Sequence, residues 1–225
     1  MAKLVVYYSR ADENYFGGQY RFIEVGNTEK VAHVIGDVTG AELFKIEQKE
    51  PYSPNYKRCI DQAMADKRAN ARPKLVKLPK DLDGYDEIYL GYPNYWGDMP
   101  MAIYTFLEAF DWTGKTIYPF CTHEGSGLSG TEQNIARTCK GADVKAGLAI
   151  CGSQADQSGE AILRWLKNKE KDEHDYETKS YASNRRRTDR HGHRPPDGIR
   201  NENRDRRQKT GERSGHLRNY EKRRV

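Results

Sequence analysis

The sequence predicts an α/β protein in which helices cover both faces of a parallel sheet. Strand-like and helix-like segments alternate through the first 167 residues, as they do in doubly wound folds. The run Ile88, Tyr89 and Leu90 is apolar throughout, which is typical of a strand buried on both faces. Pro-Asn-Tyr-Trp-Gly follows at once, so large rings stand where open α/β sheets bind ligands.

The first half of this part contains two strands and two helices. A short apolar run predicts a strand over 3–8, and amphipathic spacing predicts a helix over 28–38. A second strand is expected over 42–46. A helix is expected over 54–70, because it starts at a Ser-Pro pair and has apolar residues on one side.

The second half continues the alternation with three more strands and three more helices. Proline in a first turn supports the helix that follows the central strand. The predicted strands are 87–90, 116–121 and 144–150, and the predicted helices are 100–110, 131–139 and 159–166. With right-handed crossovers, these elements form a doubly wound sandwich.

Two segments interrupt the pattern. Residues 10–25 form a long insertion after the first strand, rich in Gly, Tyr and Asn, which we expect to be a structureless loop that is either functional or mobile. Residues 168–225 have few apolar residues and no period, so we expect this tail to be disordered. The domain organisation is therefore 1–167 and 168–225.

The basic character of the chain comes from the tail. Residues 168–225 hold 18 Lys/Arg and 11 Asp/Glu, whereas the whole chain has a net charge of +5, so residues 1–167 carry −2. The tail shows neither interleaved aromatics nor a basic amphipathic helix. We therefore do not expect nucleic-acid binding, and a mildly acidic folded part suits transient docking on a basic partner protein.

The four cysteines show no metal-ligand or C-x-x-C spacing. We interpret Cys59, Cys121, Cys139 and Cys151 as reduced structural residues and expect no metal. The apolar run 3–8 is too short for a leader segment, and no run has transmembrane length. The expected location is the cytoplasm, without a membrane partner.

Three loops leave the carboxyl ends of the first, third and fourth strands, and each is ambiguous alone. Gly26, Asn27 and Thr28 precede a helix, so they predict either a plain helix cap or an anion site. Residues 93–97 form either a wall for a flat ligand or a hydrophobic contact. Residues 123–127 predict either a flexible loop or a backbone edge for a planar ligand. His123 and Glu124 are expected to position a ligand or meet solvent, with acid–base catalysis as the second possibility.

Together the loops describe a site for an aromatic mononucleotide. The fingerprint G-x-G-x-x-G is absent after the first strand, which argues against tightly bound NAD. Residues 1–167 resemble the flavodoxin family, in particular bacterial flavodoxins with an extended first loop. The residues that carry the resemblance are 8–10, 25–28, 91–100 and 122–127.

The resemblance implies a flavodoxin-like three-layer sandwich, a five-stranded parallel sheet of order 2-1-3-4-5, and noncovalent FMN at the switch point. This sequence departs from the common flavodoxin phosphate loop, because the insertion splits that loop into two parts. Carried over by position, the phosphate residues are Ser9, Arg10, Asn27 and Thr28. The ring contacts are Pro93, Asn94, Tyr95, Trp96 and Gly97, and the residues of the other edge are His123, Glu124, Gly125, Ser126 and Gly127.

The expected function is electron transfer through FMN between redox partner proteins, with no catalytic residues of its own. Acidic residues near the loops, Asp98 and Glu124, are expected to lower the reduction potential by repelling negative charge. The alternative is an FMN-dependent NAD(P)H:quinone or flavin reductase on the same fold, which needs an open face over the ring. A third possibility is an interaction module whose tail binds nucleic acid.

Overall fold

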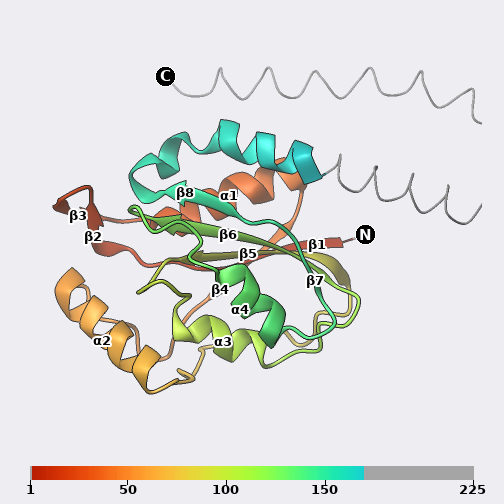
Figure 1. Cartoon of the computed structure of the whole chain (residues 1–225), viewed down its shortest axis with the longest axis horizontal. Helices are drawn as coiled ribbons and strands as arrows, with labels where there is room; N and C mark the ends of the chain where they lie inside the picture. Colours follow the sequence, from red (N-terminus) through yellow and green to blue (C-terminus); the bar gives the residue numbers. More distant parts are fainter. Residues whose placement is uncertain (1, 170–225) are drawn as a thin grey trace, which may run out of the picture. The chain divides into compact units, whose positions relative to one another are not determined.

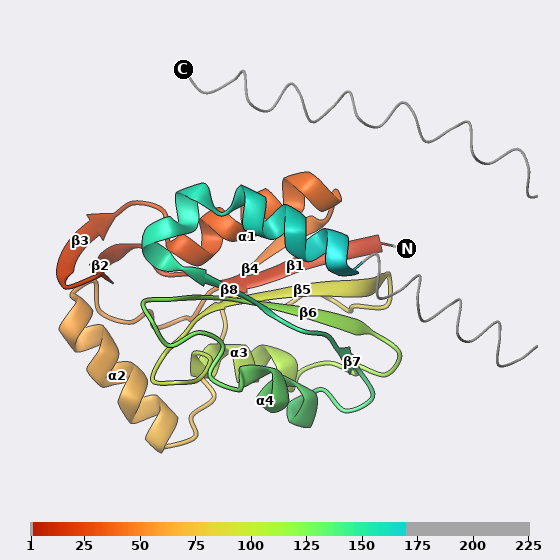
Figure 2. The ribbon, with the colours of Figure 1, turned by 45° about the horizontal axis from the view of Figure 1, so that its top comes forward.

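The computed structural model describes residues 2–169, which form a parallel six-stranded sheet between two layers of helices (Figures 1 and 2). The strand order is β4-β1-β5-β6, and both β7 and β8 pair with β6. The strands are β1 (Ala2–Tyr8), β4 (Glu42–Ile46), β5 (Tyr85–Pro93), β6 (Thr116–His123), β7 (Asp143–Val144) and β8 (Leu148–Cys151). This is the expected mostly parallel α/β architecture.

Alternating residues of the strands supply two separate cores. On β1, Val5 and Tyr7 pack with α1 (Asn27–Thr39), whereas Leu4, Val6 and Tyr8 pack on the other face. Figures 1 and 2 show α1 and the C-terminal helix, residues 159–169, on one side of the sheet. The helices on the other side are α2 (Tyr56–Arg68), α3 (Met101–Leu107) and α4 (Thr131–Thr138).

The register brings the carboxyl ends of the central strands to one edge. Tyr7 pairs with Gly91, and Gly91 pairs with Phe120, so β1, β5 and β6 end side by side. A Cβ at Gly91 would meet the Phe120 ring at 2.1 Å, so glycine is required at this crossing. The three loops singled out by the sequence therefore leave the same edge of the sheet.

The helices begin and end close to the predicted positions. The side chain of Asn55 accepts a hydrogen bond from Arg58 N and caps α2, which therefore starts two residues later than predicted. The α3 helix ends at Leu107, three residues earlier than predicted. The helix over 159–169 extends past its predicted end and follows a short 3₁₀ segment, η1 (Gly152–Gln157).

The last predicted strand is wrong in detail. Residues 144–150 form two separate segments, because β7 ends at Val144 and β8 begins at Leu148. Lys145 N still donates to Ile117 O, after which the chain leaves β6 before pairing with it again at Phe120. The sheet therefore has six strands instead of five.

The prediction of a structureless loop over residues 10–25 is also wrong. These residues contain an antiparallel hairpin of β2 (Asp12–Phe16) and β3 (Gln19–Ile23). Gly17 and Gly18 form its turn with φ of 54° and 104°, which glycine adopts readily. The insertion is thus an ordered β-ribbon beside the main sheet (Figure 2).

Asn168 and Lys169, the first two residues of the predicted tail, belong to the C-terminal helix. Lys169 Nζ donates to Glu87 and to the Tyr89 hydroxyl, which fastens this helix to the sheet. The predictions for residues 170–225 lie outside the described residues. Within residues 2–169, no helix is long and apolar enough to cross a membrane.

Candidate functional site

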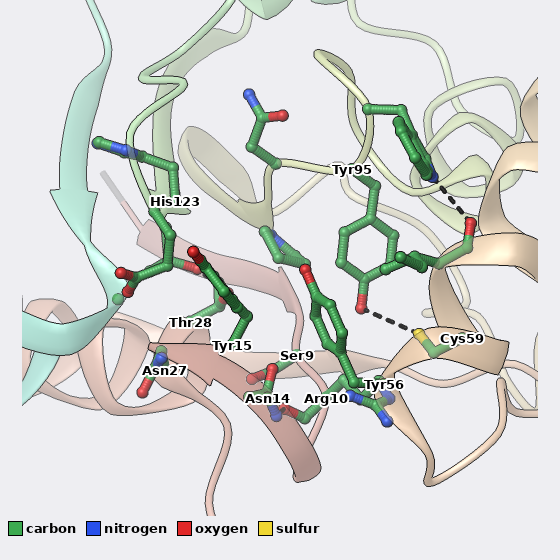
Figure 3. A pocket seen from close by; sticks show the side chains of 17 residues that line it. Ser9, Arg10, Asn14, Tyr15, Asn27, Thr28, Tyr56, Cys59, Tyr95 and His123 are labelled. Atoms are coloured by element: carbon green, nitrogen blue, oxygen red, sulfur yellow. Dashed lines mark hydrogen bonds between the residues drawn. The ribbon is translucent and has the colours of Figure 1, made fainter. Parts of the chain in front are cut away.

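A pocket opens at the carboxyl ends of β1, β5 and β6 and is shown in Figure 3. It brings together residues from all three predicted loops and from the hairpin and α2. The lining residues are Ser9, Arg10, Asn14, Tyr15, Asn27, Thr28, Tyr56, Cys59, Ile60, Pro93, Asn94, Tyr95, Trp96, Thr122, His123, Glu124 and Gly152. The predicted residues Gly97, Gly125, Ser126 and Gly127 do not line it.

One side of the pocket is the N-terminus of α1, which we call the α1 side (Ser9, Asn27, Thr28 and Thr122). Ser9 Oγ accepts a hydrogen bond of 3.0 Å from Glu29 N, inside the first turn of the helix. The Thr28 hydroxyl is buried and lies 2.7 Å from the Thr122 hydroxyl. The first-turn N–H groups of a helix have no intrahelical partner, so this end of α1 favours an anion.

Gly26 lets two backbone segments meet at the α1 side. A Cβ on this residue would stand 2.2 Å from Ser9 Oγ and 2.5 Å from Arg10 O. Its φ is −65°, so the requirement for glycine is the close approach and not the backbone angle. The loop that follows β1 is therefore pressed directly onto the start of α1, although a hairpin separates the two in sequence.

The opposite side is formed by the hairpin with Arg10 before it, by α2 and by the Tyr95 ring of the turn after β5, and we call it the hairpin side (Arg10, Tyr15, Tyr56, Cys59, Ile60 and Tyr95). The Tyr15 and Tyr56 rings are stacked, with centroids 6.1 Å apart and an interplanar angle of 26°. In Figure 3, Asn27 and Thr28 lie to one side of the Tyr15 ring, and Cys59 and Tyr95 lie to the other.

Arg10 is held by backbone carbonyl groups. Its Nη1 donates to Glu13 O at 2.6 Å, and its Nη2 donates to Ser53 O and Pro54 O at 2.8 and 2.7 Å. Its Nε is buried and has no hydrogen-bond partner among the described residues. The guanidinium of this predicted phosphate residue is thus tied to the hairpin and to the segment before α2.

The aromatic loop after β5 is a tight turn. Tyr95 N donates to Asp98 O at 2.7 Å and Asp98 N donates to Tyr95 O at 3.1 Å, while Trp96 and Gly97 have φ of 56° and 73°. A tryptophan with positive φ is an outlier that costs about 1–3 kcal/mol. Gly97 N donates to Asn94 Oδ1, which helps to hold this strained turn in place.

The two rings of this turn have different environments. Tyr95 points inward, with its ring against Tyr8 and Tyr52 and its hydroxyl 3.9 Å from Cys59 Sγ. Burial, above all, raises its pKa well above the usual range. Trp96 remains 48 % exposed, and its Nε1 donates to Ile60 O at 2.8 Å. Trp96 is therefore the ring of this turn that is free to cover a flat ligand.

The loop after β6 contributes His123 and Glu124 to the lining. His123 Nδ1 accepts from Gly125 N at 2.9 Å, which places the proton of the neutral ring on Nε2. Gly127 supports the neighbouring turn instead, because its carbonyl accepts from Asn94 Nδ2. The Ser126 carbonyl similarly accepts a bond from the Ser129 hydroxyl.

Glu124 connects three loops around the pocket. Its Oε1 accepts from Ser153 N at 2.7 Å, and its Oε2 accepts from Gly17 N in the hairpin turn at 3.2 Å. Asp98, the other acid expected near the ligand, does not line the pocket. Its Oδ1 accepts from the Tyr104 hydroxyl and from Asn134 Nδ2.

The sequence interpretation missed several lining residues. Gly-Gly between aromatic runs is a hairpin signal that would have placed Asn14 and Tyr15. Thr122 directly precedes His123 at the end of a strand, so the strand end that indicated His123 also indicated Thr122. Nothing in the sequence indicated the rest, which are Tyr56, Cys59, Ile60 and Gly152. Burial raises the pKa of the Cys59 thiol, which disfavours its reactive thiolate form.

The fold and the pocket define a class: doubly wound α/β proteins that hold a ligand at the carboxyl edge between a helix N-terminus and an aromatic turn. The family model described as flavodoxin matches residues 19–169. The chain therefore belongs to the flavodoxin family. A comparison with curated proteins gives no match.

Solved structures of flavoproteins have a similar fold. A candidate flavoprotein from Bacteroides uniformis is 26 % identical with a TM-score of 0.58, covering 74 % of this chain and 97 % of its own. One from Bacteroides eggerthii is also 26 % identical, with a TM-score of 0.57 and coverage of 74 % and 96 %. A flavoprotein from Lactobacillus acidophilus in complex with FMN is 22 % identical, with a TM-score of 0.50 and coverage of 69 % and 97 %, and shows the fold alone.

Proposed function

We propose that this protein binds FMN noncovalently in the pocket and carries electrons between redox partner proteins. Membership in the flavodoxin family supports the cofactor, as does the FMN complex of the Lactobacillus acidophilus flavoprotein. The observation that carries the proposal is that the α1 N-terminus and the aromatic turn line one pocket. These two features match the two ends of a flavin mononucleotide.

The residues present fit FMN. The α1 side offers the N–H groups of Asn27 and Thr28, at the start of the helix, and the Asn27 side chain to a phosphate monoester. The half-exposed Trp96 ring offers a face for a flat ring system, and Asn94 and His123 line the same pocket. Bound FMN supplies the electron chemistry, and the protein supplies orientation and electrostatics.

The described residues act by binding and shielding. The turn at Trp96 is bonded to α2, since Lys67 Nζ donates to Trp96 O at 2.6 Å. Glu124 places a negative charge at the pocket, which disfavours added negative charge on the cofactor. The net charge of −2 over residues 1–167 supports brief docking on a basic protein surface.

The cofactor assignment is tested by the visible spectrum of the purified full-length protein. We expect a yellow protein, and an apoprotein that binds FMN more tightly than riboflavin because the α1 side takes the phosphate. A protein that stays colourless when FMN is added would contradict the proposal.

The carrier role is tested separately with NADPH and a quinone in the absence of any reductase. An electron carrier gives no NADPH consumption above that of free FMN. Rapid, saturable NADPH oxidation would instead assign the chain to the flavin-dependent reductases.

A further inference from the structure

Arg10 bonds the end of β1 to the segment that precedes α2. Its Nη2 donates to Ser53 O and Pro54 O at 2.8 and 2.7 Å, and its Nη1 donates to Glu13 O at 2.6 Å. Its Nε is buried, so at most one of the five N–H donors of this side chain, on Nη1, remains for a ligand. The guanidinium of Arg10 is therefore committed to the backbone of the protein, although the residue lines the pocket.

Glu13 completes this attachment with a negative charge. Its Oε2 accepts from Asn55 Nδ2 and from Tyr56 N at 2.8 Å each, and its own N–H donates to Pro54 O at 3.2 Å. Tyr56 N lies in the first turn of α2, where N–H groups have no partner within the helix. Arg10 and Glu13 together therefore hold the start of α2 by charge-assisted hydrogen bonds.

The α2 helix in turn supports the Trp96 turn. Trp96 Nε1 donates to Ile60 O at 2.8 Å, Lys67 Nζ donates to Trp96 O at 2.6 Å, and both partners belong to α2. A tryptophan with φ of 56° keeps this conformation only while its surroundings impose it. The direction of the Trp96 ring therefore depends on the position of α2.

We propose that Arg10 is a positioning residue, which places the Trp96 ring through α2 and does not bind the cofactor phosphate. This rests on the proposed function, in which Trp96 covers the flavin and the α1 side takes the phosphate. A phosphate contact would need the positive charge of Arg10. Positioning needs instead its planar fork, which spans carbonyl groups of two chain segments.

The first test compares two variants that change the charge in opposite directions. Arg10→Gln removes a positive charge and Glu13→Gln removes a negative one, yet both weaken the attachment of α2. Each full-length variant is expected to bind FMN and riboflavin about threefold more weakly than the wild-type protein, with an unchanged ratio of the two affinities. If Arg10→Gln weakens FMN but not riboflavin, or if Glu13→Gln strengthens FMN, the charge of Arg10 acts on the phosphate and the proposal is overturned.

The second test reads the Trp96 turn directly, by NMR exchange rates of the indole N–H protons in the full-length protein. Arg10→Gln is expected to raise exchange at Trp96 Nε1 about threefold. Trp112 and Trp165 are internal controls, because their indoles donate to carbonyl groups outside α2, and they are expected to keep the wild-type rates. An unchanged Trp96 rate, or equal acceleration at all three indoles, overturns the proposal.

Lys115→Gln is the matched control for Arg10→Gln. Lys115 Nζ also donates to two backbone carbonyl groups, Leu82 O and Tyr85 O at 2.7 and 3.0 Å, but at the start of β5 and outside the pocket lining. Its replacement removes the same charge and is expected to leave flavin affinity and Trp96 exchange unchanged.

Arg10→Lys keeps the charge without the planar fork. It is expected to weaken FMN and riboflavin binding by the same factor, whereas recovery of FMN affinity alone would assign Arg10 to the phosphate and overturn the proposal. If the wild-type protein binds neither flavin, the proposed function fails. The indole exchange rates still decide in that case whether Arg10 positions Trp96.

Discussion

The α1 side and the hairpin side of the pocket differ in what builds them. The α1 side consists of strand ends and a helix start that the doubly wound fold brings together in any case, and its buried hydroxyls at Thr28 and Thr122 satisfy each other. The hairpin side depends on the insertion and leaves Arg10 Nε unsatisfied. The α1 side therefore follows from the fold, whereas the hairpin side follows from the insertion.

The largest effect is expected from crowding the α1 side with Gly26→Ala. The new Cβ meets Ser9 Oγ and the Arg10 carbonyl at 2.2 and 2.5 Å, so the backbone must move. We expect a loss of about 1–3 kcal/mol in unfolding free energy. We also expect roughly 10–100-fold weaker FMN binding, because the phosphate donors shift. Urea denaturation and FMN titration measure the two effects.

Gly40→Ala at the other end of α1 is the matched control. Gly40 has φ of 69° but open space around its Cβ position. It is expected to cost about 1 kcal/mol of stability through backbone strain while leaving FMN affinity unchanged. Equal FMN affinity in both variants would show that the α1 side does not hold the cofactor.

The next effect concerns the strained turn, through Trp96→Gly. Glycine removes the cost of the positive φ at the same time as it removes the ring, so we expect the unfolding free energy to change by less than about 1 kcal/mol. FMN affinity is expected to fall roughly tenfold, because stacking area is lost. Fluorescence titration of FMN and urea denaturation read the two quantities separately.

Trp112→Phe provides the contrast. The Trp112 indole is buried away from the pocket and donates to Leu107 O at 2.6 Å. Its loss is expected to cost about 1–3 kcal/mol of stability without changing FMN affinity. If Trp96→Gly destabilises as much as Trp112→Phe, the Trp96 ring is a packing element and not a ligand wall.

The difference between the two sides also explains which parts of the pocket could be predicted from the sequence. Apolar runs identify strands because burial on both faces leaves no polar positions, and the carboxyl ends of parallel strands must share an edge. The α1 side and the Trp96 turn followed from these rules. The hairpin was missed because its strands mix charged, polar and aromatic residues without clean alternation.

The directions of the side chains could not be predicted from the sequence. Tyr95 and Trp96 are neighbours of similar chemistry, yet the Tyr95 ring packs against the core and the Trp96 ring, on a residue with positive φ, is exposed. Arg10 bonds to the carbonyls of Ser53 and Pro54, which are more than forty positions away in the chain. Such contacts depend on how the hairpin packs against α2, which local patterns do not record.

A smaller effect is expected on the hairpin side from Tyr56→Ala. The Tyr56 ring packs against Tyr15 and Tyr20, with centroids 6.1 and 5.3 Å away. Its removal is expected to raise amide hydrogen exchange in β3 about tenfold, since about 1 kcal/mol of ring packing is lost. FMN affinity is expected to stay within about twofold.

Tyr56→Phe retains the ring and is expected to keep the exchange rates of the wild-type protein. A large loss of FMN affinity in Tyr56→Ala would place the cofactor itself on the hairpin side, against the division drawn between the two sides.

The smallest effect is expected at Glu124, whose carboxylate joins the hairpin turn to the segment after β8. Glu124→Gln keeps an acceptor oxygen but removes the charge, so one of the bonds to Gly17 N and Ser153 N survives. Exchange at the Gly17 amide is expected to rise about threefold, because a charge-assisted bond becomes a neutral one. The reduction potential of bound FMN is expected to rise, because a repelling negative charge is gone. Hydrogen exchange and a reductive titration followed by visible absorbance measure these changes.

Glu124→Asp separates the two roles of this carboxylate. Aspartate keeps the charge but shortens the side chain, so it is expected to loosen the Gly17 amide as Glu124→Gln does while leaving the reduction potential near the wild-type value. If both variants shift the potential alike, the potential depends on how the hairpin closes on the pocket and not on the charge. The hairpin side would then tune the cofactor held by the α1 side through its position alone.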